Sequence, residues 1–186
     1  MQVTKSPACF YRNHMPLKRI SNPNHARFLT ASTFRRTKLF DSVSIRDDFV
    51  DQIQSSREKH AVLLYAWVIM PDHVHLLVRE PHSGDIEPFL RSLKTGFAKR
   101  KLIEWRKSDP ERINQLTSPQ GQVRFWQRGG GYDRNINSDM EFNEKTDYIH
   151  MNPVRAGLVD RPIDWVWSSA RFWSGDGEFR IICDHR

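Results

Sequence analysis

The amino-acid sequence predicts an α+β fold built on a four-stranded antiparallel sheet. Two neighbouring apolar runs of strand length, joined at Pro71 and Asp72, indicate a pair of adjacent strands. Helical periodicities flank this pair on both sides, which gives the mixture of strands and helices expected of this class. The 186 residues fit one domain, and 38% hydrophobic residues with six tryptophans suffice for a packed core.

The first strand and the first helix follow from residue types and spacing. Residues 25–34 (HARFLTASTF) are rich in β-branched and aromatic residues, which are typical of a strand. In the next segment Ile45, Phe49 and Ile53 recur four residues apart, which is typical of a helix with one apolar face. Ser44 directly precedes this pattern, so we expect its side chain to cap the helix.

The central pair of strands is predicted over residues 62–79. The run VLLYAWVI (62–69) is continuously apolar and short enough for a strand in the middle of the sheet. Pro71 and Asp72 supply a turn, and HVHLLVR (73–79) follows as the neighbouring strand.

A second helix is predicted after these strands. Apolar residues recur at helical spacing from Ile86 to Phe97, so one side of this helix would face the core. The basic side chains of the same helix form either a solvated face or a surface that lies along phosphates. They are Arg91, Lys94, Lys99, Arg100, Lys101, Arg106 and Lys107.

The second half of the chain is predicted to supply the fourth strand. Residues 107–122 are polar and rich in turn-forming residues, so we expect a loop there. VRFWQ (123–127) is expected to form the strand. The glycines of RGGGYDR (128–134) are expected to free the backbone for a tight passage of the chain.

A third helix is predicted from Ser138, because Ser138 and Glu141 have the spacing of a capping box. It is expected to end near Asn152, since Pro153 disfavours a helical residue before it. The resulting β-α-β-β-α-β order fits a ferredoxin-like antiparallel sheet of four strands with an additional C-terminal helix and a tail.

We expect residues 1–186 to form a single domain, because no repeat, low-complexity tract or linker divides the chain. Within it, residues 1–24 are interpreted as a basic N-terminal arm, and residues 160–186 as a tail packed on the body. Trp165 and Trp167 are the side chains expected to hold this tail in place.

Composition restricts the class of partner. Lys and Arg number 29 against 22 Asp and Glu, which gives a net charge of +7 and a pI of about 9.7. This excess favours a polyanion, most commonly nucleic acid, over the alternative of a merely basic protein. The longest apolar run is too short to cross a bilayer, and no secretory signal is visible. Cys9 and Cys183 are expected to be free thiols of a cytoplasmic protein, and a disulfide between them is the alternative.

Two histidines stand one residue apart in the segment MPDHVHLLV (70–78). In a strand, alternate side chains share a face, so His73 and His75 would lie side by side. They are either partly buried polar residues or two ligands of one metal ion, and the pair alone does not decide between these roles.

A polar stripe runs along the third helix, because four polar residues fall at offsets of 0, 4, 7 and 11. These residues are Glu141, Lys145, Tyr148 and Asn152. Phe142 and Ile149 lie beside the stripe and can face the core. Pattern alone leaves Tyr148 as either a packing residue with a hydrated hydroxyl or a functional group.

MPDHVHLLV (70–78) and DYIHMNPVRAGLV (147–159) together resemble the REP-associated tyrosine transposases of the single-tyrosine HUH nuclease superfamily. RFWQRGGGYDRNI (124–136) and DWVWSSARFW (164–173) extend the resemblance, which covers the chain from about residue 25 to residue 173. It implies a ferredoxin-like nuclease fold, dependence on a divalent metal, and cleavage of single-stranded DNA through a covalent tyrosine adduct. The implied substrates are repeated extragenic palindromes that fold into hairpins.

The resemblance also implies roles for individual residues. His73 and His75 match the two HUH histidines, and Tyr148 matches the nucleophile of the catalytic helix. Asn152, four positions after the tyrosine, matches the residue that completes the metal site. The implied cofactor is Mg²⁺ or Mn²⁺, although imidazole and oxygen ligands are also compatible with zinc.

Basic and aromatic side chains are the candidates for DNA contacts. Lys145 either contacts phosphate or forms a solvated pair with Glu141. Trp126 and Tyr132 either stack on unpaired bases or pack on the protein. His150 lies on a different helix face from Tyr148 and is expected to be structural. The expected DNA-binding residues are Arg12, Lys18, Arg19, Lys94, Lys99, Arg100, Arg128 and Lys145.

The sequence therefore predicts a metal-dependent endonuclease and strand-transferase that acts on single-stranded DNA with REP hairpins. The alternatives are a ferredoxin-like protein that binds hairpin nucleic acid without cutting it, and a metal-dependent hydrolase that uses water. We expect a monomer rather than a dimer, no membrane partner, and a cytoplasmic location that becomes nucleoid-associated on DNA.

Overall fold

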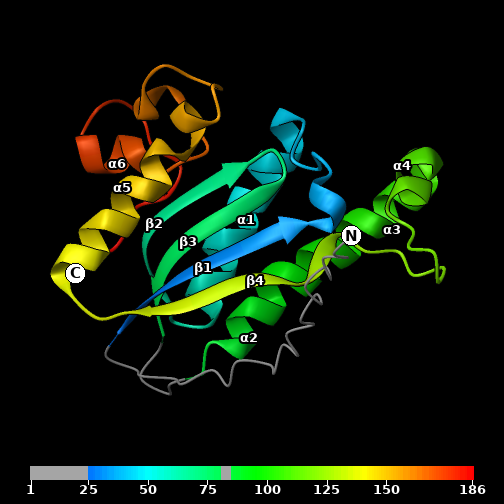
Figure 1. The fold of residues 1–186 in the computed structure, drawn as a ribbon, viewed down its shortest axis with the longest axis horizontal. Helices are drawn as coiled ribbons and strands as arrows, with labels where there is room; N and C mark the ends of the chain where they lie inside the picture. The colour runs from blue at the N-terminus through cyan, green and yellow to red at the C-terminus, as the bar shows by residue number, and fades with distance from the viewer. Residues whose placement is uncertain (1–24, 81–84) are drawn as a thin grey trace, which may run out of the picture.

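The computed structural model describes residues 25–80 and 85–186, and its centre is a four-stranded antiparallel sheet with strand order β2-β3-β1-β4 (Figure 1). The α+β class and the antiparallel sheet are as predicted, and so is the β-α-β-β-α-β order in the chain. The strands are β1 (Ala26–Thr33), β2 (Leu63–Met70), β3 (His73–Arg79) and β4 (Trp126–Ile136).

The two faces of the sheet carry different helices (Figure 1). One face packs against α1 and the long helix that follows β3, through apolar side chains such as Phe49 and Phe97. The other face packs against α5, through Phe142 and Ile149. The helices of the first face are α1 (Val43–Lys59), α2 (Glu87–Leu90), the π-helical η2 (Arg91–Gly96) and α3 (Phe97–Ser108), and α5 spans Asp139–Arg155.

Helix α1 begins two residues earlier than the sequence predicts. Ser42 has an extended backbone, and its Oγ accepts a hydrogen bond from the Ile45 amide at 3.3 Å, so Ser42 is the N-cap. The prediction of Ser44 as the cap is wrong because Ser44 already lies within the helix. Both serines precede the same apolar pattern. The sequence does not show which of them has the extended backbone of an N-cap.

We expect Ser42→Ala to lower the free energy of unfolding by about 1 kcal/mol, because an orphan amide of the first turn loses its acceptor. Ser44→Ala is the matched control, and its free energy of unfolding should stay within about 0.5 kcal/mol of the wild-type value. Urea denaturation measures both. A larger loss for Ser44→Ala than for Ser42→Ala would contradict the position of the cap.

The region predicted as a loop contains the short helix α4 (Pro110–Gln115). Asp109 caps this helix, since its carboxylate accepts from the Arg112 amide at 3.0 Å, and Pro110 occupies the first helical position. The prediction of a loop is wrong here, because Asp followed by Pro can start a helix as well as a turn.

The fourth strand also differs from its prediction, since β4 begins at Trp126 and runs through the glycines to Ile136. Pairing with β1, from Ala26 opposite Ile136 to Ala31 opposite Gly131, satisfies the backbone of this segment. The register shifts near Gly129, whose φ of +65° suits glycine and indicates a bulge. The tight passage predicted from the glycines is therefore a bulged edge strand.

Helix α5 begins as predicted, with Ser138 Oγ accepting from the Glu141 amide at 3.1 Å. Glu141 accepts from the Asn137 amide at 3.0 Å rather than from the cap residue itself. The helix continues through Pro153 to Arg155, so the predicted end near Asn152 is wrong. Pro153 lies in the last turn, where it removes only one helical hydrogen bond, and its ring is buried.

The C-terminal segment lies along the outer edge of β2. The Ile69 amide donates to the Trp167 carbonyl, and the Ser169 amide donates to the Trp67 carbonyl, both at 2.9 Å. Farther along, the Asp184 amide donates to the Leu64 carbonyl at 2.9 Å. The segment includes η3 (Pro162–Asp164) and α6 (Ala170–Ser174), and it covers an edge that would otherwise expose strand backbone.

No helix in the described ranges has the length and apolar character needed to cross a membrane. Cys183 is buried as a free thiol, and burial raises its pKa to about 12. Cys9 lies outside the described residues.

Candidate active site

Strand β3 places His73 and His75 on the sheet face that packs against α5. Their ring centroids are 4.8 Å apart. His75 is 4% exposed, and its ring lies 5.3 Å from the ring of Phe28 and 5.3 Å from the ring of Tyr148. Strand alternation therefore brings both imidazoles to one surface, as the H-x-H spacing predicts.

Each histidine is held through its Nδ1 atom. His73 Nδ1 lies 2.6 Å from a carboxylate oxygen of Asp72, and His75 Nδ1 lies 2.8 Å from Thr30 Oγ1. β1 supplies Thr30 because Thr30 pairs directly with His75 in the sheet register. Contacts of this kind are typical of metal-binding histidines, since they orient the ring and leave Nε2 for the metal.

The Nε2 atom of His75 is buried and has no hydrogen-bond partner among the described residues. Burial, then the neighbouring His73 and Arg36, lower the pKa of His75 to about 3. The ring is therefore neutral at physiological pH, which is the form that binds a metal. An unsatisfied buried nitrogen on a neutral, oriented ring fits a metal ligand.

Helix α5 places Tyr148 beside the histidines. Tyr148 is 36% exposed, and its ring also contacts Phe28 in an edge-to-face arrangement, with centroids 5.9 Å apart. Arg155, two turns farther along the helix, holds its guanidinium carbon 5.3 Å from the centroid of the Tyr148 ring. The phenol thus lies at the surface, next to one imidazole and one positive charge.

Asn152 lies one helical turn after Tyr148 on the same side of α5, and its side chain is partly buried. Within residues 25–80 and 85–186, no three His, Cys, Asp or Glu side chains gather to hold a metal ion. Asn152 stays the predicted third ligand beside His73 and His75.

His150, on another face of α5, has a different environment. Its Nε2 lies 2.9 Å from Ser169 Oγ in the C-terminal segment. Burial lowers the pKa of His150 to about 4, although Asp147 acts in the opposite direction. This histidine links α5 to the segment that covers β2.

The expected DNA-binding residues are spread over the molecule. Lys145 lies on α5 and pairs with Glu144 at 2.9 Å rather than with Glu141, and Arg128 is exposed on β4. Lys99 and Arg100 lie on α3, across the sheet from Tyr148. Arg12, Lys18 and Arg19 lie outside the described residues.

The basic helix faces a cavity of its own. Lys99 and Arg100 line a hollow of about 600 Å³ between α1 and the helix α2–η2–α3, together with Lys59 and Arg91. Lys94 lies on the same long helix, and its carbonyl accepts from Trp126 Nε1 at 2.9 Å, so that Trp126 packs on the core.

Sequence reasoning missed several residues that shape the site. Phe28, Thr30 and Arg36 come from β1 or the turn after it, and they reach the histidines only through sheet pairing. Arg155 could have been found, because it lies seven residues after Tyr148 and so two turns away on the same helix face. Tyr132 is exposed on this face, 6.0 Å from the Phe28 ring.

Comparison with known proteins now gives the family. The model of the family "Transposase IS200 like" matches residues 24–152. A Haemophilus influenzae protein named "Putative REP-associated tyrosine transposase" is 31% identical over 172 residues, which cover 84% of this chain and 92% of that protein. The "REP-associated tyrosine transposase" of Escherichia coli K12 is 29% identical over 109 residues, which cover 56% of this chain and 52% of that protein.

The fold is also that of a solved relative. A REP-associated tyrosine transposase bound to a REP hairpin superposes with a TM-score of 0.64 at 20% identity, over 92% of this chain and 94% of that one. At this identity the likeness concerns the fold, whereas the family model and the Haemophilus relative carry the assignment. The chain belongs to the IS200-like transposases and, among them, to the REP-associated tyrosine transposases.

Proposed function

We propose that this transposase cuts and rejoins single-stranded DNA next to REP hairpins through a covalent bond to Tyr148, with Mg²⁺ or Mn²⁺ at His73, His75 and Asn152. The observation that carries the proposal is the position of the Tyr148 ring, 5.3 Å from the His75 ring whose Nε2 is buried without a partner. An exposed phenol beside an unsatisfied imidazole nitrogen is suited to phosphoryl transfer.

The covalent step conserves the phosphodiester. The phenol oxygen of Tyr148 bonds to phosphorus, the bond from phosphorus to the 3′-oxygen breaks, and the phenol proton leaves to solvent while the 3′-oxygen takes up a proton. The products are a 5′-phosphotyrosine and a free 3′-hydroxyl. Because no water is consumed, the strand can be resealed or transferred to another 3′-hydroxyl by the reverse step.

The residues of the proposed site have different roles. Thr30 and Asp72 orient the two imidazoles, and burial keeps His75 neutral. Arg155 places positive charge beside Tyr148, where the phosphate must approach. A bound divalent ion would supply Lewis-acid stabilisation of the negative charge that develops on the phosphate. Imidazole and amide ligands also admit zinc, so the identity of the ion is part of the test.

Hairpin recognition is proposed from the relative whose structure is bound to a REP hairpin. The net charge of +7 supports binding to the phosphate backbone. The residues proposed to contact DNA are Arg12, Lys18, Arg19, Lys94, Lys99, Arg100, Arg128 and Lys145. Since Lys99 and Arg100 lie across the sheet from Tyr148, a hairpin that touches both surfaces would have to pass around a sheet edge.

We also propose that the chain acts as a monomer in the cytoplasm, associated with the nucleoid when it is bound to DNA. The outer edge of β2 is covered by the chain's own C-terminal segment, as the bond from the Ile69 amide to the Trp167 carbonyl shows. The edge strand β4 carries a bulge and the charged Arg128 and Arg134, which discourage pairing between copies.

The substrate should be single-stranded at the scissile bond, because its phosphate must fit between a strand-borne imidazole and a helix-borne phenol. Unpairing a base costs a few kcal/mol, so a fully duplex oligonucleotide should be cut roughly 100-fold more slowly than the hairpin with single-stranded flanks. A denaturing gel with Mg²⁺ or Mn²⁺ measures both rates and shows the covalent adduct as a DNA-shifted protein band. Equal cleavage of the two substrates would contradict this geometry.

The same gel distinguishes the rival functions. A protein that only binds hairpins should give neither product nor adduct in the presence of either metal. A hydrolase that uses water should release free 5′-phosphate and never shift with the DNA. Adduct formation by the wild type therefore supports the strand-transferase over both alternatives.

A further inference from the structure

The turn after β1 has an unusual backbone. In η1 (Phe34–Arg36), Arg35 has a φ of 53° and Arg36 a φ of 57°, both in the left-handed region that L side chains disfavour. Two consecutive non-glycine residues in this region are uncommon, and such conformations persist where the surrounding structure fixes them.

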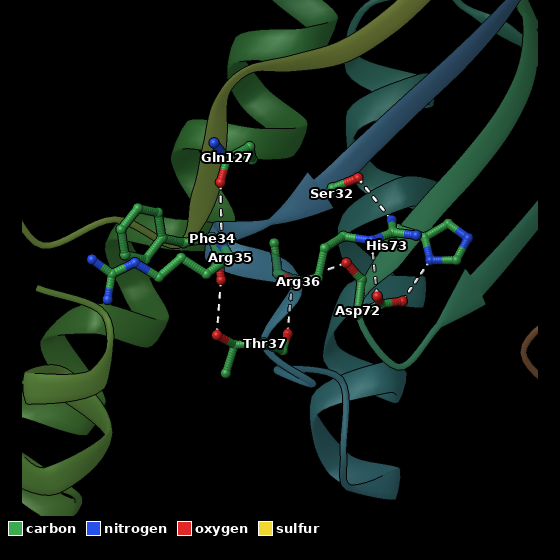
Figure 2. A network of polar contacts seen from close by, with 9 residues as sticks. Ser32, Phe34, Arg35, Arg36, Thr37, Asp72, His73 and Gln127 are labelled. Atoms are coloured by element: carbon green, nitrogen blue, oxygen red, sulfur yellow. Dashed lines mark hydrogen bonds and ion pairs between the residues drawn. The ribbon is translucent and has the colours of Figure 1, made fainter. Parts of the chain in front are cut away.

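The surroundings fix this turn from both ends. Thr33 Oγ1 donates to the Thr37 carbonyl at 2.6 Å, and Thr37 Oγ1 donates to the Phe34 carbonyl at 2.8 Å. The Arg35 amide donates to Gln127 Oε1 of β4 at 3.1 Å (Figure 2). The backbone is thereby held in one conformation, and that conformation decides where the two arginine side chains point.

The two arginines point in opposite directions (Figure 2). Arg35 extends away from the histidines and places its guanidinium carbon 4.8 Å from the centroid of the Phe34 ring. Arg36 extends toward β3, where its Nε lies 3.1 Å from Asp72 Oδ2 and its Nη1 donates to Ser32 Oγ at 3.0 Å. The other carboxylate oxygen of Asp72, Oδ1, lies 2.6 Å from His73 Nδ1.

We propose that Arg36 and Asp72 are positioning residues that hold His73 ready to bind a metal ion. Arg36 engages one oxygen of Asp72, and the remaining oxygen accepts the Nδ1–H of His73, which leaves the lone pair of the ring on Nε2. The planar guanidinium contacts Ser32 and Asp72 at once, so it fixes the direction of the carboxylate as well as its charge. This proposal rests on the proposed metal site and adds the residues that orient it.

The rival explanation is that Arg36 contacts DNA directly, since its side chain is 58% exposed. The two explanations predict different effects of Arg36 on metal affinity and on hairpin affinity. A residue that acts through Asp72 changes metal affinity in the absence of DNA, and its effect disappears once Asp72 is removed. A residue that contacts phosphate changes hairpin affinity and leaves metal affinity unchanged.

The experiment titrates Mn²⁺ into the full chain without DNA, by electron paramagnetic resonance or calorimetry. Arg36→Gln should weaken Mn²⁺ binding about tenfold, and Asp72→Ala should weaken it by about 10- to 100-fold. The double variant should bind no more weakly than Asp72→Ala alone, because the first residue acts through the second. Arg35→Gln is the matched control, with the same charge change and the same backbone region, and it should bind Mn²⁺ like the wild type.

Unchanged Mn²⁺ affinity in Arg36→Gln, or a double variant in which the two losses add, would overturn the positioning role. A loss confined to hairpin binding would overturn it in favour of direct phosphate contact. A wild type that does not bind Mn²⁺ would overturn the metal site itself, which separates that failure from the others. If circular dichroism shows that Arg36→Gln does not fold, Asp72→Asn replaces it, since the amide still accepts from His73 but loses the charge that pairs with Arg36. Weaker Mn²⁺ binding then supports the role, and unchanged binding overturns it.

Discussion

Tyr148→Phe is expected to bind hairpin DNA normally but to form no covalent adduct and no strand product. The substitution removes one oxygen and keeps the aromatic ring, so the contacts with Phe28 and His75 should survive. If the phenol oxygen of Tyr148 is the nucleophile, the substitution removes the atom that forms the phosphotyrosine bond. Gel mobility shift measures binding, and a denaturing gel measures both the adduct and the cut strand.

Tyr132→Phe is the matched control for this experiment. Tyr132 is an exposed tyrosine on the same face of the sheet, and its ring lies 6.0 Å from that of Phe28. Its variant should cut at the wild-type rate. If Tyr148 only packs, losing its hydroxyl should cost about 1 kcal/mol, roughly a fivefold effect, and cleavage should persist. Persistent adduct formation by Tyr148→Phe would refute the assigned nucleophile.

Short sequence patterns correctly predict those features of the fold that depend on residues close together in the chain. The strand over residues 73–79 has the predicted bounds, and the turn at Pro71 and Asp72 lies where a proline and a short polar residue predict it. Ser138 caps α5 as predicted, because capping depends on atoms within one turn of the chain. Each of these features is determined within a few residues.

Some of the wrong predictions concern features that are determined by residues far away in the sequence. β4 continues through three glycines because β1 pairs with it, from Ala26 opposite Ile136 onward, and residues about a hundred positions away supply that pairing. Helix α5 continues past the predicted end at Asn152, because a proline in the last turn removes only one helical hydrogen bond. The start of α4 is different, because Asp109 and Pro110 are a local signal that is compatible with either a turn or a helix.

The candidate site also combines features that nearby residues determine with features that distant residues determine. The H-x-H spacing and the position of Tyr148 on its helix are local patterns, and the fold brings the rings of His75 and Tyr148 to 5.3 Å. Thr30 and Arg36 could not be found from the sequence, because they approach the histidines across the β1–β3 pairing. Helical periodicity does not determine which face of a sheet a helix covers. The sequence therefore could not predict that Lys99 lies across the sheet from Tyr148.

The metal site gives the second large effect. His73→Ala/His75→Ala is expected to abolish cleavage with Mg²⁺ or Mn²⁺ while hairpin binding stays largely intact. In the proposed mechanism, binding depends on phosphate contacts spread over a basic surface, whereas cleavage needs the charge of an ion held at these two rings. The buried Nε2 of His75 has no hydrogen-bond partner in the described structure, so it is available to an ion. Hairpin affinity, Mn²⁺ affinity and cleavage are each measured at one fixed salt concentration.

His150→Ala is the matched control, because it removes another imidazole, one that is partly buried, contacts Ser169 and lies on a different face of α5. Both variants lose side-chain packing, so thermal unfolding must first show that each is folded at the assay temperature. His150→Ala should then keep its Mn²⁺ affinity and its cleavage, because its ring does not face the proposed ligands. Wild-type cleavage by the double variant would mean that the two imidazoles hold no essential ion, even if Tyr148 still forms the adduct.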